Sequence, residues 1–152
     1  MGLHPTTCEL ARFSAEVRSS TLKRFNEVRA GDWGWRHRSD LLSFGDVLKH
    51  LVDADRWLFE RLEGGPPSEG VVIAPGDADG MDCGAGVEEL SRLGIEKVRR
   101  IEGLTDEEFS TGRFDLGRRG VVDLAQLILR CNLDHEIHHR GALQLALRLR
   151  YG

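Results

Sequence analysis

Apolar residues recur every three or four positions in four separate segments of this chain, a spacing typical of amphipathic helices. The clearest segment, 43–62, has its apolar stripe at Phe44, Val47, Leu48, Leu51, Ala54, Leu58 and Leu62. Weaker stripes lie in 6–30, 87–102 and 121–150. Such helices bury their apolar faces by packing together, and 152 residues fit one domain. The sequence therefore predicts an all-α, single-domain four-helix bundle over residues 1–152.

Capping residues and glycines place the ends of the first two predicted helices. Thr6 or Thr7 is expected to cap the first helix, which should stop before Gly31. Ser43 is a good N-cap for the second helix. The Gly-Gly-Pro-Pro run that begins at Gly64 should end it.

The second half of the chain carries weaker helix signals. The third helix is marked from Val87 onwards and is weakened by Gly94. Thr105 is expected to cap a short helical turn, and the last helix should run over 121–150. The only strand signal is the short apolar run at 71–75, so no sheet is expected.

A long glycine- and proline-rich segment separates the second predicted helix from the third. Residues 64–86 contain seven glycines and three prolines. A loop of this length is unusual inside a compact domain and indicates a crossover or a lid. At about 3.3 Å per extended residue it is long enough to span a helix. We therefore expect the second and third helices to run parallel, which a short turn would forbid.

Composition excludes several classes of protein. The net charge of −4 and the pI near 5.9 provide no basic surface for nucleic acid. The three cysteines, Cys8, Cys83 and Cys131, are widely spaced and form no CxxC pair, which argues against a disulfide framework. No apolar run reaches the roughly 20 residues of a membrane span, and no signal peptide is recognisable. We expect a cytoplasmic protein with no membrane or nucleic-acid partner.

Histidines are crowded into one stretch of the last predicted helix, "DHEIHH". His135 and His139 are four residues apart, so their rings project from one face of the helix. His50 lies among apolar neighbours on the second helix. Three inward-facing imidazoles would hold a divalent metal ion and leave coordination positions open, which is the pattern of catalytic sites. His4 and His37 lie in terminal or connecting sequence, where an exposed position is expected.

The sequence allows other interpretations of the histidines and of the carboxylates near them. A histidine on an apolar helix face is often a hydrogen-bonded core residue, and His138 also shares a face with His135. Asp53 and Asp134 are candidates to accept hydrogen bonds from the imidazoles, although each could equally be a solvated carboxylate. Glu136 points elsewhere on the helix and is a poor candidate for a general base.

Two spaced motifs resemble the DinB superfamily, the DinB and YfiT-like group of four-helix proteins. "FGDVLKHLVDADRWLFERL" and, about 75 residues later, "LDHEIHHRGAL" match its second-helix and HxxHHRGQL patterns. The matching residues are Ser43, His50, Leu51, His135, His138, His139, Arg140, Gly141 and Leu143. The resemblance implies an up-down-down-up bundle that often dimerises. It also implies that His50, His135 and His139 hold a divalent metal ion, commonly zinc or nickel.

The resemblance also implies a class of reaction. Well-understood relatives transfer or isomerise small-molecule substrates with low-molecular-weight thiols such as bacillithiol or mycothiol. The leading hypothesis is therefore a metal-dependent thiol S-transferase or a related detoxifying enzyme. A metal-dependent hydrolase and a non-catalytic metal-binding stress-response protein, of the DNA-damage-inducible type, are the alternatives. Ala142 departs from the family pattern, which has glutamine there, and places close functional equivalence in doubt.

Overall fold

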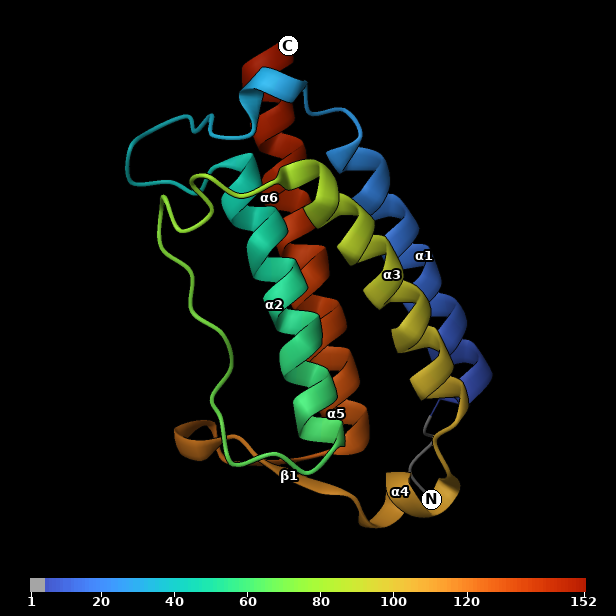
Figure 1. Ribbon diagram of the computed structural model, residues 1–152. Helices are drawn as coiled ribbons and strands as arrows, with labels where there is room; N and C mark the ends of the chain where they lie inside the picture. Colours follow the sequence, from blue (N-terminus) through green and yellow to red (C-terminus); the bar gives the residue numbers. More distant parts are fainter. Residues whose placement is uncertain (1–4) are drawn as a thin grey trace.

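The computed structural model describes residues 5–152, and four long helices form its body (Figure 1). They are α1 (Thr7–Phe25), α2 (Phe44–Leu62), α3 (Cys83–Glu102) and α6 (Asp134–Tyr151). α1 and α6 run in one direction, and α2 and α3 run in the other (Figure 1). Both α1 and α2 pack against α3 and α6. The predicted all-α bundle, with its second and third helices parallel, is confirmed.

Side-chain caps start these helices where the sequence provides them. Thr6 and Ser43 each accept a hydrogen bond from the backbone N–H three residues on, and the acidic side chain there bonds back to the cap. The third helix begins earlier than predicted, at Cys83, because the Asp82 side chain accepts from Ala85 N. The connection between α2 and α3, which we call the crossover, is therefore residues 63–82.

The crossover is tied to the bundle at several points. The buried carboxylate of Asp46 accepts hydrogen bonds from Gly76 N at 3.0 Å and Ala78 N at 2.9 Å. Trp57 Nε1 donates to Ser68 Oγ at 2.9 Å. Between these anchors Val72 is 94% exposed. The apolar run at 71–75 forms no strand and belongs to this loop.

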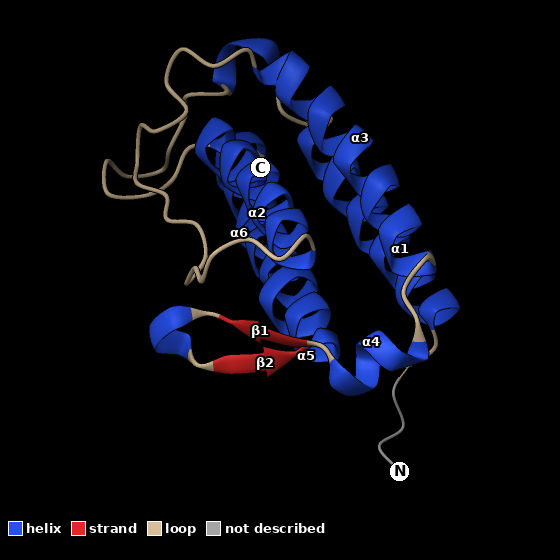
Figure 2. Ribbon diagram, turned by 60° about the horizontal axis from the view of Figure 1, so that its bottom comes forward, coloured by secondary structure: helices blue, strands red, loops and turns tan. Residues whose placement is uncertain are grey.

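A small β-hairpin replaces the predicted start of the last helix (Figure 2). Strands β1 (Arg113–Asp115) and β2 (Val121–Asp123) pair antiparallel, with Phe114 opposite Val122. Gly117 and Gly120 have φ values of +62° and +87°, which lets the chain turn there through the short helix η2 (Gly117–Arg119). Two other short helices are η1 (Ala30–Asp32) and α4 (Asp106–Thr111). The expectation of helix over 121–123, and of no sheet, was wrong.

The last helical stretch is not one regular α-helix. It consists of α5 (Leu124–Ile128), a π-helical turn η3 (Leu129–Leu133) and α6. One residue of an α-helix corresponds to about 100° of rotation, so the wider π turn shifts the faces of α5 and α6 relative to each other. The shift comes directly before Asp134 and His135, and it lets α5 and α6 each direct its own buried residues inward.

The apolar core consists of two clusters of buried residues, and α4, α5 and the hairpin lie at one end of the bundle (Figure 1). Its most deeply buried members, with no exposed surface, are Leu48, Leu58, Leu90, Leu127, Ile128 and Leu133. No described helix is long and apolar enough to cross a bilayer.

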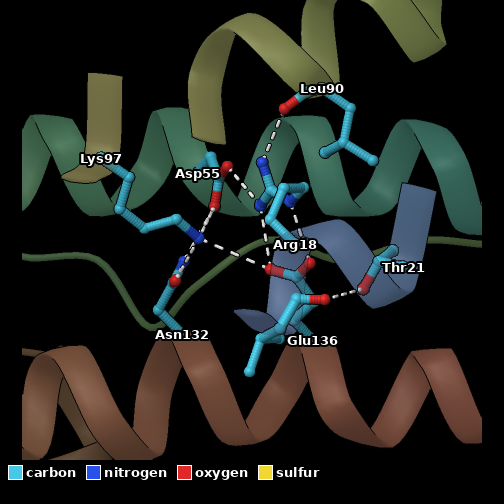
Figure 3. Close-up of polar contacts among 8 residues, drawn as sticks. Arg18, Thr21, Asp55, Leu90, Lys97, Asn132 and Glu136 are labelled. Atoms are coloured by element: carbon cyan, nitrogen blue, oxygen red, sulfur yellow. Dashed lines mark hydrogen bonds and ion pairs between the residues drawn. The ribbon is translucent and has the colours of Figure 1, made fainter. Parts of the chain in front are cut away.

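Four charged side chains lie inside the bundle and connect its four long helices (Figure 3). Arg18 of α1 donates to Asp55 Oδ2 of α2 at 2.7 Å and to both Glu136 carboxylate oxygens of α6 at 2.9 Å. Lys97 Nζ of α3 donates to Asp55 Oδ1 and Asn132 Oδ1, each at 2.7 Å. All five side chains are at most 4% exposed. We call Arg18, Asp55, Lys97 and Glu136 the buried charge network; its formal charges cancel, which such deep burial requires.

Gly94 provides the space for this network. A Cβ at position 94 would lie 2.7 Å from Arg18 Cγ. The Arg18 side chain therefore crosses α3 at the position where the helix has no side chain, and its Nη1 donates to Leu90 O at 2.6 Å. The glycine that weakens the helix signal in the sequence is thus required by packing.

Candidate metal centre

Three histidines from two helices meet on the inner side of the bundle. The potential ligand atoms of His50, His135 and His139 all lie within 4.8 Å of one another, a group that could hold a metal ion. Their ring centroids form a nearly equilateral triangle with sides of 4.6, 4.6 and 4.7 Å. The Nε2 atoms of His50 and His135 are 2.8 Å apart. The structure therefore brings together the three residues that the sequence singled out.

Helix geometry explains this convergence. His50 lies in the second turn of α2, on its buried face, and is 5% exposed. His135 and His139 are one helical turn apart on α6, and both are partly buried. The π turn η3 ends directly before α6, and π turns inside helices are frequent at functional sites.

Burial keeps these imidazoles neutral. It lowers the pKa of His50, and it lowers that of His135 to about 4, with a further contribution from the neighbouring His50. The pKa of His139 falls to about 3, again chiefly through burial and then through the charge of His135. A neutral imidazole has a free nitrogen lone pair, which is the form that binds metal ions.

The carboxylates proposed as hydrogen-bond partners of the imidazoles do not make that contact. Asp53 forms an ion pair with Lys49 one turn earlier on α2, and Asp134 is exposed. Within residues 5–152, the buried Nδ1 atoms of His50 and His135 have no hydrogen-bond partner. Of the two interpretations that the sequence left open, the carboxylate without an imidazole partner therefore holds for both residues, and Asp53 pairs with the i, i+4 lysine.

The other histidines lie outside the triad. His138 is exposed, and its ring centroid is 5.1 Å from that of His139. It neighbours the three-histidine group without belonging to it. His37 is exposed, as expected, and its ring is next to Trp35. His4 lies outside the described residues.

Glu136 is part of the buried charge network and not of the histidine group. It is 2% exposed, and the guanidinium of Arg18 with the ammonium of Lys97 lowers the pKa of its carboxyl group to about 2. Although it follows His135 directly, its side chain is turned by about 100° around α6. It pairs with Arg18 and Lys97 in the buried charge network (Figure 3). This agrees with the expectation that it is no general base for the triad.

The protein is an up-down-down-up helical bundle with a three-histidine group between α2 and α6 (Figure 1). The sequence profile of the DinB superfamily matches residues 15–143. Because this match covers most of the chain, the protein belongs to the DinB superfamily.

The comparison with solved structures agrees on the fold. The chain is similar to an uncharacterized protein from Clostridium difficile 630, with a TM-score of 0.65 and 11% sequence identity. The alignment covers 93% of this chain and 95% of that one. No curated protein matches the chain.

Proposed function

We propose that this protein is a divalent-metal-dependent enzyme that uses a low-molecular-weight thiol, a thiol S-transferase or a related detoxifying enzyme. His50, His135 and His139 would hold the ion, with zinc or nickel as the expected metals. The observation that carries this proposal is the triangle of partly buried, neutral imidazoles. Imidazole nitrogens suit zinc, nickel, copper and iron, and three of them leave coordination positions for a substrate.

The surroundings of the triad favour a thiol over an activated water. A metal-dependent hydrolase needs a general base near the ion, and the acidic residues adjacent to the triad are engaged or exposed. Asp53 pairs with Lys49, Glu136 is buried among cations, and Asp134 is exposed. A bound metal ion acidifies a thiol directly, so that thiolate forms at neutral pH without a protein base.

The proposed roles of the protein's residues are to hold the metal ion and to contact the substrate. The three histidines would fix the position at which sulfur is held, and burial lowers the pKa of all three, which favours the neutral form that binds a metal ion. His138, exposed and beside His139, is positioned to contact a substrate at the open side of the group. We further propose that the protein acts in the cytoplasm and that it forms a homodimer, as its family often does.

A cobalt titration tests the proposal. Cobalt(II) takes the place of zinc in histidine sites, and a thiolate bound to it produces a near-ultraviolet charge-transfer band. We expect cobalt-loaded wild-type protein to gain this band with bacillithiol, mycothiol or cysteine. His50→Ala and His139→Ala should lose both cobalt and the band. His138→Ala is the matched control for metal binding and should keep the cobalt.

Two results would contradict the proposal. If cobalt binds at the triad but no thiol changes the spectrum, the protein binds a metal ion without using a thiol, and the thiol-dependent function is contradicted. If His50→Ala binds cobalt as well as the wild-type protein does, His50 is not a metal ligand and the three-histidine site is contradicted. Metal analysis of protein purified without nickel resin identifies the native ion.

A further inference from the structure

An apolar pocket of about 310 Å³ lies next to the three-histidine group, between the first turn of α2, the loop before it and residues 138–149 of α6. Its floor is formed by buried side chains and its rim by partly exposed ones: Phe44, Val47 and Leu143 below, and Leu41, Leu145 and Leu149 above. We call it the apolar pocket. It is about twice the size of the roughly 150 Å³ cavity that holds a benzene molecule.

The apolar pocket and the histidine group share a wall. His139 lines the pocket as well as belonging to the group. Val47 is one helical turn before His50, and Ala142 is one turn after His139. The pocket thus begins one turn from the candidate ligands on both helices, and a molecule bound at the histidines has this cavity beside it.

The rim exposes apolar side chains to solvent. Leu41 is 44% exposed, Leu145 59% and Leu149 50%. Exposed leucines clustered around a concavity are typical of a binding site, since each costs free energy in water until it is covered. The polar groups in the lining are few. The imidazoles of His37 and His138 lie in it, and the Ser43 side chain is already occupied in capping α2.

We propose that the apolar pocket binds an alkyl or aryl group of the substrate whose polar end is held at the three-histidine centre. This inference rests on the proposed metal-dependent function and adds the chemical class of the substrate: a molecule with an uncharged apolar group of about six to ten carbon atoms. Ala142 is a specificity-determining residue, because its small side chain keeps the pocket wall apolar and open. A longer polar side chain there would fill the entrance.

Hydroxamates are suitable probes, because the hydroxamate group binds zinc and its acyl chain can be lengthened. Calorimetry on zinc-loaded wild-type protein would compare acetohydroxamate with octanohydroxamate. Burial of each methylene is worth about a fourfold gain in affinity. We expect octanohydroxamate, which has six more methylenes, to bind at least 100-fold more tightly.

Two variants in the pocket are expected to lose this gain. Ala142→Gln should reduce it to less than tenfold, and Leu145→Gln, at the exposed rim where folding is not at risk, should weaken octanohydroxamate more than acetohydroxamate. Ala85→Gln makes the same exchange at an exposed position of α3 outside the pocket and should keep the full gain. Zinc content, measured for each protein, shows that the triad is intact.

The possible results distinguish the proposed metal-dependent function from the proposed apolar substrate group. Zinc-loaded protein that binds both hydroxamates with less than a tenfold difference overturns the substrate class and leaves the metal site standing. Protein that takes up no zinc, or that binds neither hydroxamate, overturns the proposed function and this inference with it. Sedimentation showing that Leu145→Gln dissociates a wild-type dimer would assign the pocket to a second copy of the chain and overturn the inference.

Discussion

Neutralising Glu136 should destabilise the bundle far more than neutralising an exposed glutamate. In Glu136→Gln the buried cations Arg18 and Lys97 would be left with Asp55 as their only carboxylate partner. Breaking a buried ion pair by removing one partner costs about 3–5 kcal/mol, because the remaining charge is buried without compensation. That is a large part of the roughly 5–15 kcal/mol that stabilises a domain.

Urea unfolding of the metal-free protein measures this loss. With a slope of about 2 kcal/mol per molar urea, the expected cost lowers the midpoint by about 2 M. Glu88→Gln is the matched control: Glu88 is exposed on α3, and the same substitution should change stability by less than about 0.5 kcal/mol.

A second substitution tests whether charge balance is the cause. Lys97→Met alone removes one cation, whereas Lys97→Met combined with Glu136→Gln leaves the neutral Arg18–Asp55 pair. We expect the double variant to be more stable than the sum of the single effects implies, by about 2 kcal/mol. A cost below about 1 kcal/mol for Glu136→Gln, or strictly additive effects, would show that the bundle does not depend on the charge balance of this network.

Three further predictions concern the glycine, the crossover and the pH dependence of stability. Gly94→Ala should lower the melting temperature despite the better helix propensity of alanine, because the added Cβ meets Arg18 at 2.7 Å; a raised melting temperature would contradict this. In hydrogen exchange the amides of Gly76 and Ala78 should be protected and that of Val72 should exchange fast, and Asp46→Ala should remove the protection. The metal-free protein should lose stability as the pH falls from about 6.5 towards 4, because folded His135 and His139, with pKa values lowered to about 4 and 3, bind fewer protons than the unfolded chain. Thermal melts of a His135→Gln/His139→Gln variant should show a weaker decline between pH 6.5 and 5, and an unchanged decline would show that other groups titrate.

Local rules explain why the sequence predicts the helices and the triad. The caps involve residues only three apart: Ser43 caps the second helix as expected, and Thr6 is the one of the two candidate threonines that caps the first. His135 and His139 share a face through helix periodicity alone. His50 was a candidate because it lies among apolar neighbours, and the resemblance to the DinB superfamily assigned it to the same site.

Other features depend on partners far apart in the sequence, or on small energy differences. The β-hairpin was missed because apolar Val121 and Val122 also fit the start of a helix, and because its strands have three residues each. The π turn has no recognised sequence signal. The buried charge network left one clue: Lys97 lies four residues after Leu93 and four before Ile101, on the buried face of α3. Its partners, on three other helices, follow only from the packed bundle.

The most direct test of the metal centre is X-ray absorption at the zinc edge of the zinc-loaded protein. We expect three imidazole nitrogens at about 2.0–2.1 Å from the zinc together with at least one non-protein ligand. The spectrum should be the same for His138→Ala and should lose imidazole scattering in His135→Ala. A sulfur shell at about 2.3 Å in the absence of added thiol, which would come from a cysteine, or a zinc ion surrounded by water oxygens alone, would contradict the assignment of His50, His135 and His139 as the metal ligands.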